Sequence, residues 1–163
     1  MKLSLCINAP EDTQGADDGD SNTIPNERIE HISEILQEEL LRLYPASESY
    51  EAAEISLSFV RPEEIRELNR EYRNIDEATD VLSFPMIDID SDDEPSDLPV
   101  LTLGDIVICP EEVSRLHPEM THDDAINLMI AHSFLHLLGY DHDSEEKQNE
   151  MWALQEEIAG RLK

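Results

Sequence analysis

The sequence AINLMIAHSFLHLLG, residues 125–139, sets the architecture that we expect for this chain. Apolar residues occur on almost every face of the helix that it predicts, and a helix that is apolar all round is a buried one. Gly139 is suited to the positive φ that ends many helices, so the helix should stop there. We therefore predict a central buried helix around which the other elements pack.

The segments before and after this helix predict a small sheet and further helices. Short apolar or alternating runs predict strands at 2–8, 55–59, 81–84 and 101–109. Helical spacing of apolar residues predicts other helices, which begin near Pro25, Pro62, Pro110 and Ser144. This order predicts an α+β fold in a single domain, residues 1–163: a mixed sheet of about four strands covered by helices, with acidic loops near 11–22 and 88–97.

The chain is strongly acidic, with 39 Asp and Glu residues, 11 Lys and Arg residues and a net charge of −28. Most of this charge lies outside the acidic runs at 11–20 and 88–97. Molar salt shortens the Debye length to about 3 Å, which suppresses self-repulsion on such a surface. We therefore expect a salt-adapted protein, on which a small basic patch can still bind nucleic acid.

The termini and apolar runs bear on localisation. No apolar run reaches the roughly 18 residues of a membrane span. The first apolar run is shorter than the ~7–15 residues of a signal-peptide core and is followed by acidic residues. Cys6 and Cys109 have no CxxC spacing and are expected to be free or buried thiols. We predict a cytoplasmic protein with no membrane partner.

Three histidines have the spacing of a zinc site. His132 and His136 are four residues apart, so their rings lie on one helix face, and the turn at Gly139 lets His142 return to the same ion. Three imidazoles leave a fourth position open for water, which is the pattern of a catalytic zinc. A structural zinc completed by Cys109 is the alternative.

Other residues limit the chemistry of such a site. Ser133 occupies the position at which H-E-x-x-H proteases have the glutamate that acts as general base, which argues against a metalloprotease. Asp141 either orients an imidazole or forms a turn, and the sequence leaves both open. The other histidines are isolated among polar residues and are expected to have no functional role: His31, His117 and His122.

Three blocks of the chain resemble a known family. AHSFLHLLGYDH, residues 131–142, resembles the H-G-x-L-H-L-x-G-Y-D-H signature of the YbeY family of bacterial ribosomal-RNA-processing metalloendoribonucleases. LNREYRNIDEATDVLSFP at 68–85 and LGDIVICP at 103–110 are similar to that family's second and third signatures, in the same order. Ser133 departs from the usual glycine of the first signature, and its small size is compatible with the site.

The resemblance implies one Zn²⁺ per chain, bound by His132, His136 and His142 at the floor of a cleft, with Arg73 as the essential cation. It implies cleavage of single-stranded RNA in 16S rRNA 3′-end maturation and ribosome quality control. The expected partners are single-stranded rRNA and the ribosome or its small-subunit proteins. A non-catalytic ribosome-assembly factor with a structural zinc is the alternative from another functional class.

The arginines of residues 62–73 fit this interpretation. Arg66, Arg70 and Arg73 are spaced i, i+4 and i+7, so they share one helix face. A guanidinium binds phosphate through two parallel hydrogen bonds and keeps its charge near neutral pH. We expect Arg73 to stabilise charge on the phosphate. Arg66 and Arg70 are either further RNA contacts or part of a solvated face paired with glutamates.

Overall fold

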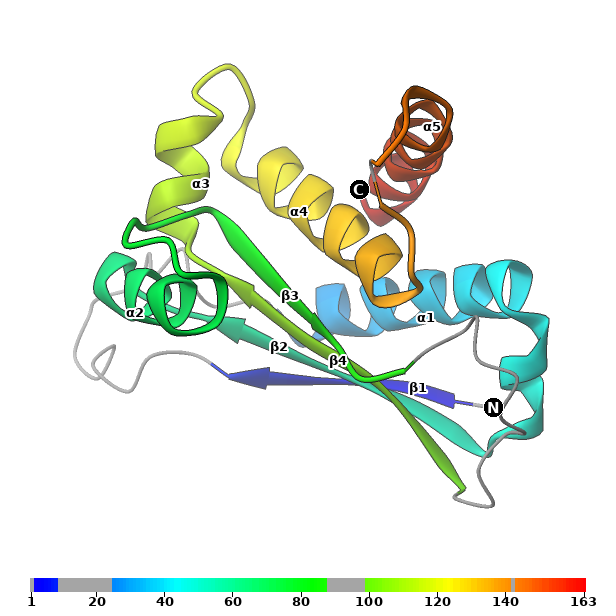
Figure 1. The fold of residues 1–163 in the computed structure, drawn as a ribbon. Helices are drawn as coiled ribbons and strands as arrows, with labels where there is room; N and C mark the ends of the chain where they lie inside the picture. Colours follow the sequence, from blue (N-terminus) through cyan, green and yellow to red (C-terminus); the bar gives the residue numbers. More distant parts are fainter. Residues whose placement is uncertain (1, 9–24, 88–98, 142) are drawn as a thin grey trace.

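The computed structural model describes residues 2–8, 25–87, 99–141 and 143–163 (Figure 1). Its strands are β1 (Lys2–Asn8), β2 (Ala52–Phe59), β3 (Val81–Pro85) and β4 (Val100–Ile108). Its helices are α1 (Asn26–Leu43), α2 (Pro62–Arg73), α3 (Pro110–Leu116), α4 (His122–Leu137) and α5 (Glu145–Leu162), with a 3₁₀ turn, η2, at Pro45–Ser49. The predicted acidic loops near 11–22 and 88–97 lie outside the described residues.

The described strands form one mixed sheet in the order β1-β2-β4-β3. β1 and β4 run parallel to β2, whereas β3 runs antiparallel to β4. Helix α1 provides the crossover that the parallel pair of β1 and β2 requires. The predicted α+β fold with a four-stranded mixed sheet is therefore confirmed, and β3 forms one edge of that sheet.

The inner face of the sheet carries the main core. Ile55 and Leu57 of β2 are buried against the helices, as are Leu103 and Ile106 of β4. Helix α1 packs on β1, and α4 packs on β3 and β4, with α5 on top of α4 (Figure 1). Ten of the 16 residues of α4 are buried, which confirms the predicted central helix. That this helix carries a metal ion stays a prediction.

The outer face of the sheet is more polar and is covered only in part. Ser56 and Ser58 of β2 point to this face, since they alternate with the buried residues of the inner face. Helix α2 covers the far end, where Ile65 packs against Leu82 and Val107 in a second, smaller core. The sheet therefore leaves part of its outer face accessible beside α2.

The two ends of α4 have the local signals that the sequence predicts. The N-cap Thr121 accepts a hydrogen bond from a backbone N–H three residues later. At the other end Gly139 has a φ of +92°, and its N–H donates to His136 O at 3.0 Å. Tyr140 N–H donates to Leu135 O at 3.0 Å, which completes a Schellman motif. This turn ends the helix at Leu137, with Leu138 as the C-cap residue.

A bulge in β4 fixes how β3 lies against it. The register shifts so that Glu54 faces Thr102 while Ile55 faces Gly104, which leaves Leu103 as the extra residue. Gly104 has a φ of +143°, and a Cβ at this position would lie 2.3 Å from Phe84 O. Only glycine permits this close approach of the two backbones.

A buried carboxylate ties the C-terminal helix to the rest of the fold. Glu39 of α1 is 1% exposed and forms ion pairs with Arg42 and with Arg161 of α5. Arg161 also pairs with Glu38 and accepts, at its carbonyl, a hydrogen bond from His31. Because an unpaired buried charge is unfavourable, these pairs favour a single docking position for α5.

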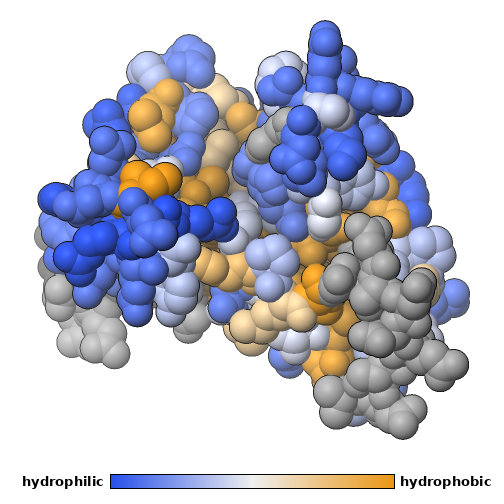
Figure 2. Space-filling model, viewed as in Figure 1, coloured by the Kyte–Doolittle hydropathy of each residue, from blue (hydrophilic) through white to orange (hydrophobic). Residues whose placement is uncertain are grey.

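The surface of the described residues is largely hydrophilic. In Figure 2 hydrophilic residues cover the ends of the molecule, and apolar residues show towards the middle of the visible face. No helix in the described parts of the chain combines the length and the apolar character needed to cross a membrane.

Candidate active site

Two histidines of α4 converge at the surface of the core helix. His132 and His136 are half-buried, and their ring centroids lie 4.5 Å apart at 79°. The two Nε2 atoms are 3.1 Å apart. This places both nitrogens on the same side of α4, as their i, i+4 spacing predicts.

The pair has the geometry of two zinc ligands. Ligands of a tetrahedral zinc, each about 2.0–2.1 Å from the metal, stand roughly 3.3 Å from one another, close to the observed separation of the two nitrogens. His132 donates through Nδ1–H to Gln155 Oε1 at 2.7 Å, which directs the lone pair of Nε2 towards His136. His132 and His136 therefore fit two ligand positions of a zinc ion.

The predicted third ligand, His142, lies outside the described residues. Within 2–8, 25–87, 99–141 and 143–163, no three His, Cys, Asp or Glu side chains form a metal-binding group. Cys109, the fourth ligand that a structural zinc would require, belongs to the smaller core beside α2. Burial there, with the nearby Glu111 and Glu112 carboxylates, raises the pKa of the Cys109 thiol, although a hydrogen bond from a backbone N–H partly offsets this. The described residues give no support to a structural zinc completed by Cys109.

Arg73 reaches the same cavity from the opposite side. It is the last residue of α2, and Asn74 follows in the left-handed conformation and turns the chain. Arg73 Nη2 donates to Ser83 O at 2.9 Å, on the unpaired edge of β3. Arg73, His132 and His136 line one cavity of about 430 Å³, whose remaining described lining comes from β3. The fold thus brings together residues about sixty positions apart.

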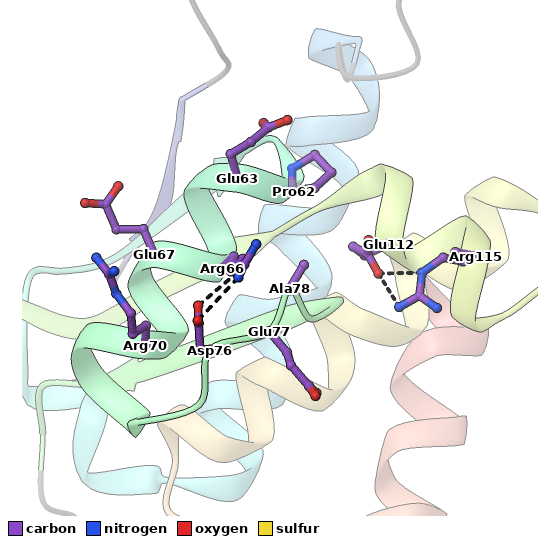
Figure 3. Close-up of a pocket in the computed structure, with 10 residues that line it drawn as sticks. All are labelled: Pro62, Glu63, Arg66, Glu67, Arg70, Asp76, Glu77, Ala78, Glu112 and Arg115. Atoms are coloured by element: carbon purple, nitrogen blue, oxygen red, sulfur yellow. Dashed lines mark hydrogen bonds and ion pairs between the residues drawn. The ribbon is translucent and has the colours of Figure 1, made fainter.

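Arg66 and Arg70 lie in a different cavity, of about 830 Å³ (Figure 3). Arg66 Nε donates to Asp76 Oδ1 at 2.9 Å, and this pairing lowers the pKa of the Asp76 carboxyl. Arg115 of α3 is similarly paired with Glu112. Arg66 and Arg70 are not among the described residues that line the histidine cavity, and their own cavity has more carboxylates than arginines. Their role in RNA binding stays a prediction.

Ser133 and Asp141 are not among the described residues that line the histidine cavity. Ser133 is 0% exposed, and within the described residues its Oγ has no hydrogen-bond partner. Asp141 Oδ1 accepts a hydrogen bond from Asp143 N–H at 3.2 Å and lies 4.0 Å from Lys147 Nζ. The first contact is that of a turn residue, which is one of the two interpretations of Asp141 that the sequence leaves open.

Two contacts at this site could not be predicted from the sequence. Gln155 comes from α5, 23 residues after His132, and the only local signal is its position four residues after the buried Met151. Ser83 contributes a backbone carbonyl, which no side-chain pattern reveals. A similar long-range contact links His117 Nε2 to Asp80 Oδ2 at 3.0 Å and gives this histidine a structural role.

Comparison with known proteins identifies relatives of this chain. The sequence model described as endoribonuclease YbeY matches residues 16–163. The endoribonuclease YbeY of Clostridioides difficile (strain 630) is 41% identical over 145 residues, which cover 88% of this chain and 91% of the relative. That of Geobacillus thermodenitrificans (strain NG80-2) is 41% identical over 153 residues, which cover 88% of this chain and 92% of the relative.

One solved structure is also similar. A solution structure of a Thermotoga maritima protein has a TM-score of 0.49 and 23% sequence identity, and the match covers 98% of this chain and 88% of that one.

Proposed function

This chain belongs to the YbeY family of endoribonucleases, and on that premise we propose that it is a zinc-dependent endoribonuclease that cleaves single-stranded ribosomal RNA. The observation that carries the proposal is the cavity shared by Arg73, His132 and His136. A permanent cation and two imidazoles that are suited to binding a metal ion line one cavity. Cleavage of a phosphodiester can use both kinds of group.

Arg73 is the phosphate-binding group in this proposal. A guanidinium has five N–H donors, and the described contact with Ser83 O uses one of them. Two parallel hydrogen bonds to phosphate oxygens remain geometrically open to it, and they strengthen as negative charge develops in the transition state. The contact with β3 holds the guanidinium in place before substrate arrives.

His132 and His136 are the metal-holding groups, together with His142. The hydrogen bond from His132 to Gln155 fixes the orientation of the first ring, and the helix fixes the spacing of the second. A zinc ion bound here would act as a Lewis acid towards an oxygen of the phosphodiester. We propose one zinc ion per chain.

Peptide hydrolysis fits this cavity poorly. A zinc protease of this motif needs a carboxylate base, whereas Ser133 is buried in the core. The described lining of the cavity contains no Asp or Glu side chain, and it contains Arg73 instead. These observations favour a phosphate substrate over a peptide.

The biological substrate that we propose is the precursor of 16S rRNA, at its 3′ end. The protein would act in the cytoplasm on small ribosomal subunits during late maturation and quality control, as the family resemblance implies. A net charge of −28 disfavours non-specific RNA binding, so binding is expected to depend on local cations such as Arg73.

The test is cleavage of single-stranded RNA by protein purified from a ribonuclease-deficient host, with the zinc content measured on the same samples. We expect His136→Ala to lose zinc and cleavage together. Arg73→Ala is expected to keep zinc and lower kcat by about 10²–10³-fold, as loss of a transition-state donor does.

Matched controls make this test specific. His122→Ala removes an imidazole from the start of the same helix, and Arg115→Gln removes a cation outside the cavity. Both are expected to retain zinc and cleavage. Zinc-bound protein that cleaves no RNA would favour the non-catalytic assembly factor, and normal 16S rRNA 3′ ends in depleted cells would exclude the proposed substrate.

A further inference from the structure

A third cavity lies on the outer face of the sheet, close to Arg73. It has a volume of about 360 Å³, within the roughly 300–1,000 Å³ of small-ligand pockets. Its principal lining residues, which define the outer-face pocket, are Ser56, Ser58, Tyr72, Phe84, Asp105 and Val107. Neither zinc binding nor phosphate binding, as proposed above, uses these side chains.

Arg73 connects the outer-face pocket to the histidine cavity. Ser83 and Phe84 are consecutive in β3, so their side chains point to opposite faces of the sheet. The Arg73 guanidinium binds Ser83 O and lies 6.0 Å from the centre of the Phe84 ring. A nucleic acid strand with a phosphate at Arg73 can therefore place an adjacent base against the outer face.

The aromatic side of the pocket is suited to stacking. Tyr72 is 59% exposed, and its ring meets the Phe84 ring edge-on, with centroids 5.3 Å apart at 68°. The Phe84 ring contacts the tyrosine ring and leaves much of its surface accessible. Exposed aromatic rings of this kind stack the splayed bases of single-stranded RNA.

The opposite side of the pocket carries hydrogen-bonding groups in fixed register. Phe84, Asp105 and Ser56 are direct partners across β3, β4 and β2, so they form one row on the outer face. Asp105 is half-buried, and no hydrogen bond or ion pair of its carboxylate occurs with the other described residues. Its two oxygens are acceptors that a ligand with paired N–H donors would satisfy.

Guanine is the base that matches this row. Its Watson–Crick edge presents N1–H and the N2 amine side by side, which suits both oxygens of a carboxylate. Uracil presents one N–H between two carbonyl oxygens, and a carboxylate repels those oxygens. Adenine and cytosine each offer a single amine. The serine hydroxyls of Ser56 and Ser58 can donate to the remaining acceptors of guanine.

We propose that the outer-face pocket binds a guanine base of the RNA next to the phosphate held by Arg73, with Tyr72 stacking on the base and Asp105 reading its edge. The proposal rests on the proposed function, because it gives that RNA cleavage a base preference. Tyr72 and Asp105 act in positioning and specificity, and take no part in the chemical step.

The first experiment maps cleavage sites in a single-stranded RNA library with randomised positions. Wild type is expected to cut preferentially beside guanine. Asp105→Asn should reduce that preference about tenfold with little change in kcat, because the amide offers one acceptor in place of two. Tyr72→Ala should raise KM about tenfold, and Tyr72→Phe, which retains stacking, should behave as wild type.

The second experiment measures binding without cleavage. Guanosine monophosphate is titrated while the backbone amide resonances of Asp105 and Phe84 are followed by NMR, with uridine monophosphate as the control. We expect shifts with the guanine nucleotide that Asp105→Asn removes. A purely structural Asp105 would give neither the nucleotide-dependent shifts nor the change in base preference.

The two experiments separate the two proposals. RNA cleavage with equal use of all bases, unchanged in Asp105→Asn, would overturn the guanine pocket and leave the nuclease standing. Guanine-specific shifts in a protein that cleaves no RNA would overturn the nuclease and leave the pocket as a base-binding site. Shifts of equal size with both nucleotides would overturn the guanine assignment.

Discussion

Replacing Gly104 with alanine is expected to destabilise the fold by about 3–5 kcal/mol. Its φ of +143° lies in a region that is essentially restricted to glycine, so alanine there is strained by about 1–3 kcal/mol. The new Cβ would also lie 2.3 Å from Phe84 O, so β3 must move away from β4. Such overpacking costs about 1–3 kcal/mol, and the weakened Met86 N–H···Leu103 O bond adds up to about 1 kcal/mol, so the middle of the summed range is about 3–5 kcal/mol.

Two other glycines provide matched controls for this value. Gly139 has a φ of +92°, and a Cβ added there would meet nothing within 4 Å, so Gly139→Ala should introduce backbone strain alone, about 1–2 kcal/mol. Gly160 lies in α5 with an equally open surrounding and no positive φ. Gly160→Ala should therefore stabilise the protein by about 0.5 kcal/mol.

Urea unfolding and thermal unfolding, each followed by circular dichroism, measure the stability of all three variants. For a chain of this size, 3–5 kcal/mol corresponds to a decrease in Tm of about 10 °C. From the most stable to the least stable, the predicted order is Gly160→Ala, wild type, Gly139→Ala and Gly104→Ala. If the free energies of unfolding of Gly104→Ala and Gly139→Ala differ by less than about 1 kcal/mol, the close contact between β3 and β4 does not disfavour a side chain at Gly104 and the reasoning is wrong.

Three further predictions concern the core and the surface. Because burial raises the pKa of the Cys109 thiol, it should stay protonated at neutral pH, so a thiol reagent should modify only the exposed Cys6 in native protein; equal reaction rates would contradict this. Ser133→Ala removes a buried hydroxyl that has no described partner and should raise the free energy of unfolding by about 1 kcal/mol in urea titrations, while a loss of stability would indicate a hidden hydrogen bond. Molar KCl should raise the Tm by screening the charge of −28, and an unchanged Tm would refute adaptation to salt.

Much of this architecture follows from local pattern. The apolar periodicity of 125–138 predicts the buried helix α4, and Gly139 and Thr121 predict its ends, because these features depend on residues a few positions apart. The i, i+4 spacing likewise predicts that His132 and His136 face one side. In the same way, the spacing of apolar residues along the chain predicts the four strands and the helices between them.

Tertiary structure alone decided how these elements meet. Arg66, Arg70 and Arg73 share one predicted helix face, yet only Arg73 lines the histidine cavity, because α2 ends there and Asn74 turns the chain beside β3. The strand order β1-β2-β4-β3 leaves β3 at the edge, where Ser83 O is open to the guanidinium. Such pairings depend on contacts between residues far apart in the chain, which local spacing does not encode.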